Sequence, residues 1–195
     1  MTGAVIVLAG PSGVGKGTVV AKLKAQHPEL WVSVSVTTRP PRPGEVDGRT
    51  YHFVSDREFD DLVAGDGLLE WAVVHRKARY GTPRRPVLDA VAEGRTCLLE
   101  VDLAGARQVR RTMPSAVSVF LAPPSWEALE ARLRGRGTED DEAVARRLAT
   151  ARHELAAADE FDHVVVNGEL GATVAELVGL LGLGSGNHEP APSVT

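Results

Sequence analysis

The stretch Ala4-Val-Ile-Val-Leu-Ala9 runs directly into Gly10-Pro-Ser-Gly-Val-Gly15-Lys16-Gly17-Thr18, and this junction decides the fold. The apolar run predicts a strand that is buried on both faces. Apolar residues between Val19 and Leu23 recur at helical spacing, so an amphipathic helix is expected after the glycines, ending before Pro28. A strand, a glycine-rich turn and a helix in this order are typical of a phosphate loop, in which backbone N–H groups and the helix N-terminus face a phosphate.

The phosphate loop predicts binding of a nucleoside triphosphate, with Lys16 as a mobile positive charge. Gly17 stands where a Ser or Thr usually provides a hydroxyl for Mg²⁺, so Thr18 is the nearest candidate for that ligand. The residues expected to bind ATP are Gly10, Pro11, Ser12, Gly13, Val14, Gly15, Lys16, Gly17 and Thr18.

An ATPase, a GTPase, a transporter motor or a small-molecule kinase could each use such a loop. The sequence has no Asn-Lys-x-Asp motif of the kind that reads guanine in GTPases. A chain of 195 residues cannot house the long helical subdomain of a transporter motor. A kinase is therefore the leading class.

The rest of the chain alternates strands with helices. Strands are expected at residues 32–36, 51–54, 68–74, 96–101, 116–121 and 164–166, and helices at 56–64, 83–93, 103–112, 126–134, 144–155 and 173–181. The helix at 56–64 starts with a capping box from Ser55 and Glu58, and the next has Thr82 as its expected N-cap and Pro83 at its first position. This rhythm predicts an α/β fold whose central parallel sheet is flanked by helices, with the site at the carboxyl ends of the strands.

Several apolar side chains are predicted to face the core. In the two helices described above they are Phe59, Leu62, Val63, Val87, Leu88 and Val91, and the strand at 164–166 is expected to be buried.

The composition of the chain limits the partners and the cellular location that we expect for the protein. Hydrophobic residues make up 43% of the chain and charged residues 25%, which is far from the signature of disorder. The net charge of −4 gives no positive field for nucleic acid, so no nucleic-acid partner is expected. Cys97 is the only cysteine, and the longest early apolar run is too short to span a bilayer. We expect a cytoplasmic protein without a membrane partner.

The segment Val34-Ser-Val-Thr-Thr-Arg39-Pro-Pro-Arg42-Pro-Gly-Glu45-Val-Asp-Gly-Arg-Thr-Tyr51 provides the sharpest signal after the phosphate loop. Arg39 and Arg42 stand three apart in a proline-stiffened part of this segment, so both guanidinium groups can close on one phosphate. The segment resembles the GMP-binding segment of guanylate kinases, and the resemblance continues almost throughout the chain. It implies that Arg39, Arg42 and Tyr51 grip the GMP phosphate while Glu45 orients an arginine.

Leu69-Glu70-Trp-Ala and Tyr80-Gly-Thr82 resemble the same family, whose matching glutamate and hydroxyl read the guanine. Guanine presents the adjacent donors N1–H and N2–H, which one carboxylate can accept, whereas adenine presents an acceptor there. Glu70 is therefore expected to set base specificity. Ser35 and Thr82 can donate to the guanine O6.

Glu100 and Asp102 stand two apart at the end of a predicted strand, so both side chains point to the same face. The family commonly has two aspartates here. The resemblance implies that Asp102 binds the amino edge of guanine or holds Mg²⁺ through water, while Glu100 is one methylene longer than the usual residue.

Arg134-Gly-Arg136-Gly and Arg146-Arg147 resemble the lid of guanylate kinases, whose arginines close over the transferring phosphoryl group. Asn167 matches a family position near adenine. Arg134 and Asn167 are thereby expected on the ATP side of the site.

The resemblance as a whole implies transfer of the γ-phosphoryl group of ATP to GMP, with Mg²⁺, by a P-loop kinase with a small GMP-binding insert and a mobile lid. The expected catalytic residues are Lys16, Arg39, Arg136 and Arg147. The expected GMP site contains Ser35, Arg39, Arg42, Glu45, Tyr51, Glu70, Tyr80, Thr82, Glu100 and Asp102. The expected parts are a domain at 1–183 with its core at 1–32, 83–124 and 157–183, an insert at 33–82, a lid at 125–156 and a disordered tail at 184–195.

Two other functions fit parts of this pattern. A kinase for a sugar phosphate could share the fold but would lack the guanine-reading set of Ser35, Glu70 and Thr82. A non-catalytic module could bind a phosphoprotein through the same arginines, but it would not need Lys16 or the lid. The sequence does not indicate an oligomeric state.

Overall fold

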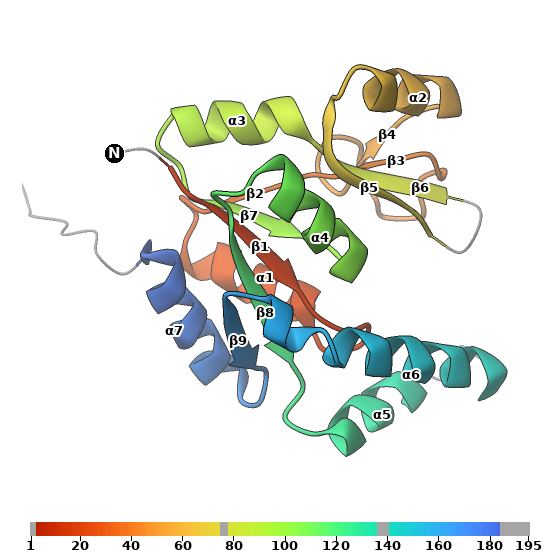
Figure 1. Cartoon of the computed structure of the whole chain (residues 1–195), viewed down its shortest axis with the longest axis vertical. Coiled ribbons are helices and arrows are strands. Elements are labelled where there is room, and N and C mark those ends of the chain that lie inside the picture. Colours follow the sequence, from red (N-terminus) through yellow and green to blue (C-terminus); the bar gives the residue numbers. More distant parts are fainter. Residues whose placement is uncertain (1–2, 75–77, 136–140, 184–195) are drawn as a thin grey trace, which may run out of the picture.

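The computed structural model describes residues 3–74, 78–135 and 141–183, and a five-stranded sheet lies at its centre. Neighbouring strands all pair in parallel, in the order β2-β7-β1-β8-β9 (Figure 1). The strands are β1 (Val5–Ala9), β2 (Trp31–Val32), β7 (Cys97–Glu100), β8 (Val117–Ala122) and β9 (His163–Val166). The predicted α/β class with a central parallel sheet is confirmed.

Helices cover both faces of this sheet, and β1 contributes to both cores. Ile6 and Leu8 pack into one apolar cluster, whereas Val5 and Val7 pack into another on the opposite face. The first cluster is covered by α1 (Lys16–Gln26), α5 (Trp126–Arg134), α6 (Asp141–Leu155) and α7 (Leu170–Leu181), and the second by α3 (Arg84–Ala92) and α4 (Leu103–Thr112). The two-faced burial predicted for this strand is confirmed, because alternate residues of a strand point to opposite faces.

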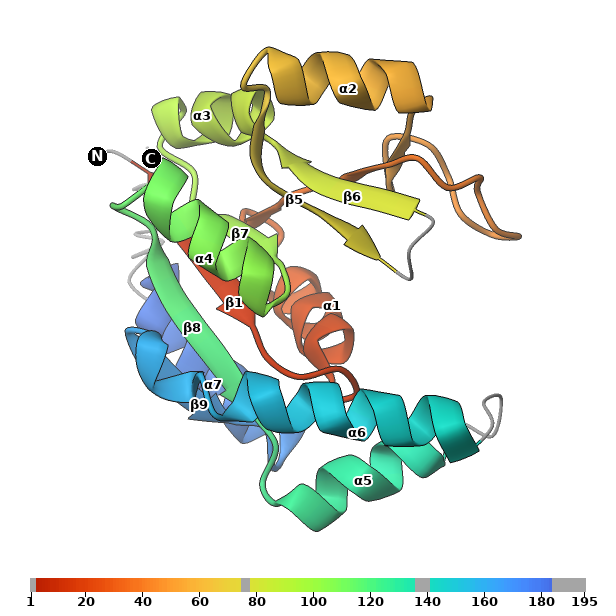
Figure 2. The ribbon, with the colours of Figure 1, turned by 45° about the vertical axis from the view of Figure 1, so that its right-hand side comes forward.

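A second, four-stranded sheet lies apart from the first, with α2 (Asp56–Ala64) over it (Figure 2). Its strands are β3 (Val36–Thr37), β4 (His52–Phe53), β5 (Leu68–Val74) and β6 (Ala78–Pro83), in the order β4-β3-β6-β5. Val36, Phe59 and Leu68 form its small core. These strands lie within residues 33–82, for which the sequence predicts an insert, except that β6 extends one residue further to Pro83.

The single strand predicted at residues 32–36 is wrong. The structure divides this stretch between β2 in the large sheet and β3 in the small one. Ser33 N still donates to Leu98 O of the large sheet, while Ser35 O already accepts from His52 N of the small one. Alternating hydrophobicity reports a pleated backbone and says nothing about the neighbour that each half pairs with.

The N-cap predicted at Thr82 is also wrong. Thr82 and Pro83 belong to β6, and α3 begins at Arg84 with Pro83 as its N-cap. Thr82 pairs with Glu70 across the sheet, and its hydroxyl donates to the carboxylate of Glu70 instead of to a helix N-terminus. A long-range partner has overridden the local capping signal.

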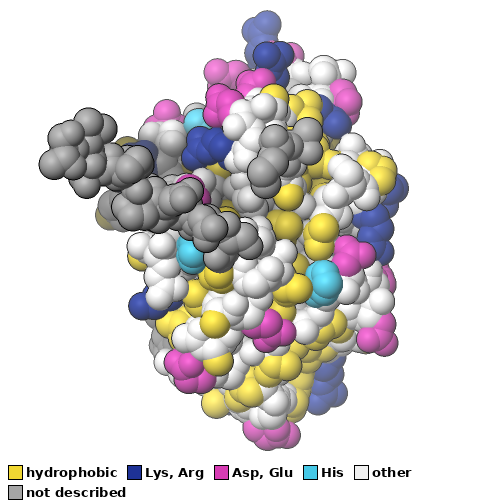
Figure 3. All heavy atoms as spheres, turned by 90° about the vertical axis from the view of Figure 1, so that its left-hand side faces the viewer, with side chains coloured by type: hydrophobic (Ala, Val, Ile, Leu, Met, Phe, Trp, Pro, Cys, Tyr) yellow, Lys and Arg dark blue, Asp and Glu magenta, His cyan; other side chains and the backbone are white. Residues whose placement is uncertain are grey.

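Four predicted core residues reach the surface. Val63 and Leu88 lie on the outer sides of α2 and α3 with 36% and 43% exposure, because each of these helices has a single covered face. Val164 and Val166 are about half exposed because they point to the face of β9 opposite to that of Val165, which is buried in the core. Hydrophobic side chains also reach the surface between scattered charged ones on the side where α7 lies (Figure 3).

No helix in the described part of the chain is long and apolar enough to cross a bilayer.

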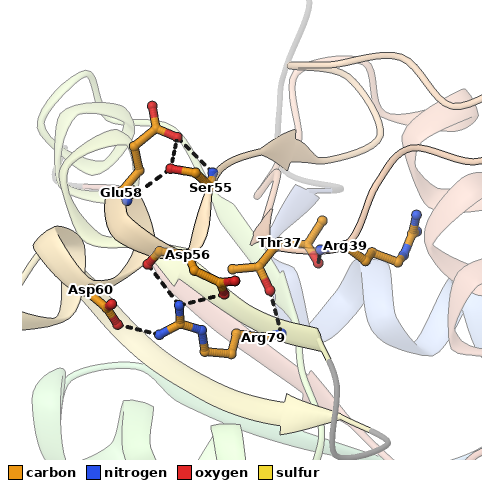
Figure 4. A network of polar contacts seen from close by, with 8 residues as sticks. Thr37, Arg39, Ser55, Asp56, Glu58, Asp60 and Arg79 are labelled. Carbon is orange, nitrogen blue, oxygen red and sulfur yellow. Dashed lines mark hydrogen bonds and ion pairs between the residues drawn. The ribbon is translucent and has the colours of Figure 1, made fainter.

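Helix α2 is fastened to the small sheet at its first turn. Ser55 Oγ accepts from Glu58 N at 3.2 Å while Glu58 Oε2 accepts from Ser55 N at 2.7 Å, which is the predicted capping box. Arg79 of β6 forms ion pairs with Asp56 at 2.8 Å and Asp60 at 2.5 Å, as Figure 4 shows. Its guanidinium also stacks over the Phe59 ring, 4.6 Å from the ring centroid.

Ser55→Ala should destabilise the protein by about 1 kcal/mol, because it removes the acceptor of the capping box at α2. Urea unfolding at pH 7 measures the difference. Glu58→Gln is the matched control and should cost less, because its amide oxygen still accepts from Ser55 N. Equal unfolding midpoints for Ser55→Ala and the wild type would contradict the capping role.

Candidate active site

Two cavities adjoin at the carboxyl ends of β1 and β7. The larger, of about 340 Å³, lies between the two sheets, and the smaller, of about 260 Å³, lies over the glycine loop. Lys16 and Glu100 line both cavities. The larger is lined by Lys16, Val32, Ser33, Ser35, Thr50, Tyr51, Glu70, Ala72, Tyr80, Glu100, Val101 and Asp102, and the smaller by Pro11, Ser12, Gly13, Gly15, Lys16, Gly17, Thr18 and Glu100.

The glycine loop needs glycine for two physical reasons. Gly13 and Gly15 adopt φ values of 84° and 103°, in the left-handed region that other residues avoid. A Cβ at Gly10 would lie 2.4 Å from Leu121 O of the neighbouring strand β8, so a side chain cannot fit there. The loop can therefore close around an anion with its N–H groups inward.

Two side chains hold the loop from behind. Asn167 Nδ2 donates to Val14 O at 2.7 Å, and Arg132 Nη1 donates to the same carbonyl at 2.9 Å. Asn167 is buried, lines neither cavity and supports the loop through Val14, while its expected place near adenine stays a prediction. Arg132 was not predicted, because the resemblance to the lid motif begins at Arg134, the other arginine of α5.

Lys16 lies at the start of α1, where its Nζ donates to Gly10 O at 2.6 Å. Burial lowers the pKa of this ammonium, while the carboxylates of Glu100, Glu154 and Asp102 oppose that shift. The lysine thus sits beside the loop, between the two cavities and facing acidic groups.

Helix α6 reaches the glycine loop through two side chains. Arg147 Nη2 donates to Ser12 Oγ at 2.7 Å, so the structure brings the predicted Arg147 to the loop. Glu154, which the sequence analysis missed, is 9% exposed and its Oε2 accepts from Ser12 N at 3.4 Å. Burial raises the pKa of its carboxyl. Ser12 and Glu154 are 142 positions apart in the chain, so only the fold could reveal this contact.

Arg134 is a second lid arginine that the structure describes. Arg134 forms an ion pair with Glu130 on its own helix α5, at 2.8 Å. Arg136 lies outside the described residues, as does the predicted tail at 184–195.

Arg39 is held by three groups of the loop and small sheet. Its guanidinium donates to both carboxylate oxygens of Glu45 at 2.6 Å each, and its Nε donates to Tyr80 OH at 2.9 Å. The Tyr51 ring lies beneath it, 5.0 Å from the centroid to Cζ. Hydrogen bonds from Arg39 and from Arg42 N lower the pKa of Glu45 to about 2. The predicted orienting role of Glu45 therefore has a geometric basis, whereas the side chain of Arg42 is exposed.

Glu70 lies on β5 with 8% exposure and lines the larger cavity. Its Oε1 accepts from Thr82 Oγ1 at 2.6 Å. Burial raises the pKa of Glu70 to about 7, and the negative charge of Asp102 adds to the shift. Thr82 is 1% exposed and donates its single hydroxyl hydrogen to Glu70, so it positions the carboxylate instead of facing the cavity.

Glu100 and Asp102 both line the larger cavity, as their spacing predicts. Burial raises the pKa of Glu100, against the nearby positive charge of Lys16. Asp102 Oδ1 accepts from Gly105 N at 2.7 Å and so caps α4, which leaves its other oxygen for a ligand. Two serines also line this cavity: Ser35, which was predicted, and Ser33, which was not.

This part of the site concerns the side chains near the glycine loop that could bind a metal ion. Within the part of the chain that the structure describes, a Cβ at Gly17 would meet nothing within 4 Å, so none of these side chains replaces the missing hydroxyl. Thr18 lines the smaller cavity beside Glu100. Among the described residues, no three His, Cys, Asp or Glu side chains gather closely enough to hold a metal by themselves.

A family model described as guanylate kinase matches residues 2–182. Curated guanylate kinases resemble the chain closely. The guanylate kinase of Cutibacterium acnes is 62% identical over 92% of this chain and 90% of its own length, and that of Thermobifida fusca is 61% identical over 90% and 89%.

Solved structures agree with this comparison. The crystal structure of guanylate kinase from Anaplasma phagocytophilum is 34% identical, has a TM-score of 0.74 and covers 93% of this chain and 86% of that one. A shikimate kinase from Bacteroides thetaiotaomicron, 17% identical with a TM-score of 0.52 and covering 92% and 98%, shares the fold alone.

The buried carboxyl of Glu70 should make stability depend on pH. Its pKa is about 7 in the folded protein against 4.5 for the ordinary group, so the folded form keeps a proton that the unfolded form has lost. The resulting stabilisation is present below about pH 4.5 and is lost as the pH rises to about 7. Glu70→Gln cannot ionise, so its stability relative to wild type should rise by on the order of 2 kcal/mol between about pH 5 and pH 8.

Urea unfolding of both proteins at several pH values measures this trend. A constant difference between the two proteins across the whole range would show that Glu70 titrates normally.

Proposed function

The chain belongs to the guanylate kinase family, and we propose that its two adjoining cavities hold the two nucleotides of that family's reaction. The reaction is transfer of the γ-phosphoryl group of ATP to GMP, which gives ADP and GDP. The observation that carries the proposal is the sharing of Lys16 and Glu100 by both cavities, because phosphoryl transfer requires the donor and acceptor phosphates to meet.

GMP is proposed to occupy the larger cavity. Glu70 accepts hydrogen bonds from guanine N1–H and N2–H, Ser35 donates to O6, and Asp102 faces the amino edge. Arg39, Arg42, Tyr51 and Tyr80 bind the phosphate, with Arg39 presented by Glu45. Thr82 contributes by holding the Glu70 carboxylate.

ATP is proposed to place its phosphates in the smaller cavity, against the N–H groups of residues 10–18. Lys16 exchanges its hydrogen bond to Gly10 O for one to the phosphates of ATP. Arg147 exchanges its hydrogen bond to Ser12 Oγ for one to the phosphoryl group that is transferred. Arg134 and Arg136 belong to the same lid. Asn167 acts on this side through Val14, by fixing the shape of the loop.

The chemistry needs no general base. An ionised oxygen of the GMP phosphate attacks the γ-phosphorus, a new P–O bond forms, and the bond to the bridging oxygen of ADP breaks in line with it. The protein contributes alignment and positive charge. Lys16, Arg39, Arg136 and Arg147 are the residues assigned to that role.

Mg²⁺ suits the donors present. It favours oxygen ligands, commonly one or two carboxylates with phosphates and water, and Thr18, Glu100 and Asp102 supply a hydroxyl and two carboxylates at the cavities. Thr18 and Asp102 would hold it, the latter through water. When bound, it neutralises charge on the triphosphate.

We propose that residues 33–82 form an insert and residues 125–156 a lid, and that both close on the core at 1–32, 83–124 and 157–183 when the nucleotides bind. We further propose that the enzyme works in the cytoplasm on these two small molecules. Neither nucleic acid nor a membrane has a place in the reaction.

Activity should be specific for GMP. ADP formation from ATP and Mg²⁺ should be seen with GMP and be at least about 100-fold lower in kcat/KM with AMP, CMP, UMP or a sugar phosphate. Glu70→Gln should lower kcat/KM for GMP at least about tenfold while the KM for ATP stays near wild type, because a hydrogen bond to a charged group is lost. A sugar phosphate as the best acceptor would support the rival kinase, and absence of turnover with tight phosphopeptide binding would support the non-catalytic module.

Lys16→Met should reduce kcat by about 100-fold or more without unfolding the protein, because the transferring phosphoryl group loses its charged partner. Lys24→Met is the matched control, since Lys24 is an exposed lysine at the other end of the same helix. Steady-state kinetics and thermal unfolding are measured on both variants. Equal kcat in the two variants would overturn the assignment of Lys16.

A further inference from the structure

Helix α4 packs beside the Glu70 carboxylate, and the residue of α4 that faces this carboxylate is Gly105. A Cβ built on Gly105 would lie 2.8 Å from Glu70 Oε2, 3.1 Å from Val101 Cβ and 3.3 Å from Asp102 Oδ1. The backbone does not require glycine there, because Gly105 is helical and has no positive φ. Glycine is a poor helix former in this position, so the space it leaves is the physical reason for its presence.

The helix cannot easily retreat from the strand. Gln108 Oε1 accepts from Trp71 N at 3.1 Å, and Gln108 Nε2 donates to Trp71 O at 2.9 Å. Thr112 Oγ1 donates to Leu69 O at 2.8 Å. Since β5 is the edge strand of its sheet, these two side chains take the place of a neighbouring strand on either side of Glu70.

The carboxylate is held from its other side as well. Thr82 Oγ1 of β6 donates to Oε1, while Oε2 is the oxygen that faces Gly105. The Glu70 carboxylate therefore lies between the Thr82 hydroxyl of β6 and Gly105 of α4, which has no side chain. Any atom added at position 105 has to displace the end of the Glu70 side chain, which is the most easily moved of its neighbours.

We propose that Gly105 is a positioning residue for guanine recognition, which places the Glu70 carboxylate in the GMP cavity by leaving room for its Oε2. The inference rests on the proposed function, because it takes Glu70 as the group that reads guanine. It assigns a specificity role to a residue that itself makes no contact with the base.

Gly105→Ala tests this directly. The KM for GMP should rise at least about tenfold, because the carboxylate can no longer accept both guanine donors in line, while the KM for ATP stays within about twofold of wild type. Gly179→Ala is the matched control, because Gly179 is also helical and a Cβ there would meet no atom of the described residues within 4 Å. This control should keep wild-type constants for both nucleotides.

A double-mutant cycle separates positioning from general damage. Glu70→Asp shortens the side chain and withdraws the carboxylate from the helix, so adding Gly105→Ala to it should change the KM for GMP by less than about threefold. Equal fold-changes in the wild-type and Glu70→Asp backgrounds, a parallel rise in the KM for ATP, or an unchanged KM for GMP would each overturn the proposal. Should Gly105→Ala fail to fold alone yet fold with Glu70→Asp, the predicted collision is supported.

Failure of the proposal and failure of the proposed function give different results. If the wild-type protein phosphorylates GMP but Gly105→Ala leaves its KM unchanged, only the role of Gly105 is wrong. If the wild type does not phosphorylate GMP, the function itself is wrong.

Discussion

Strand β1 hydrogen-bonds to β7 along one edge and to β8 along the other, while its alternate side chains enter apolar clusters on both faces of the sheet. Such a strand cannot shift without breaking both ladders and both cores. The loop that follows Ala9 inherits this rigidity, and Leu121 O of β8 leaves room only for glycine at position 10. The predicted phosphate loop thus follows a strand that is fixed along both edges and on both faces.

The positive groups of the site are already placed by the protein's own polar groups. Lys16 donates to a loop carbonyl, Arg39 is gripped by Glu45 and Tyr80, and Arg147 rests on Ser12. Each side chain therefore loses less conformational freedom when a phosphate binds. Glu100 and Asp102 also line the larger cavity. The positive charges nearby reduce the electrostatic repulsion between these carboxylates and an anionic substrate.

The two sheets are joined beside the larger cavity, which Ser33, Ser35 and Glu70 line. The chain passes from the large sheet to the small one across residues 33–35, whose backbone groups pair with both. Helix α4 adds a second connection through Gln108 and Thr112, on either side of Glu70. Movement of the small sheet would accordingly carry Glu70 with it, and under the proposed function such a closure would act directly on guanine recognition.

Local signals in the sequence were sufficient for the phosphate loop, the alternation of strands and helices, the two-faced burial of β1 and the capping box at Ser55, because each depends on residues close together in the chain. The family resemblance added the arginine loop and Glu70. Residues whose contacts depend on distant partners were missed or misplaced: Thr82 donates to Glu70 and does not cap a helix, and Glu154 accepts from Ser12 across the fold. The support that Asn167 gives to Val14 was likewise not visible in the sequence. The division of the strands between two sheets and the burial of the Glu70 carboxylate are properties of the assembled structure. Hydrophobic patterning specifies which face of a segment is covered but not which segment covers it.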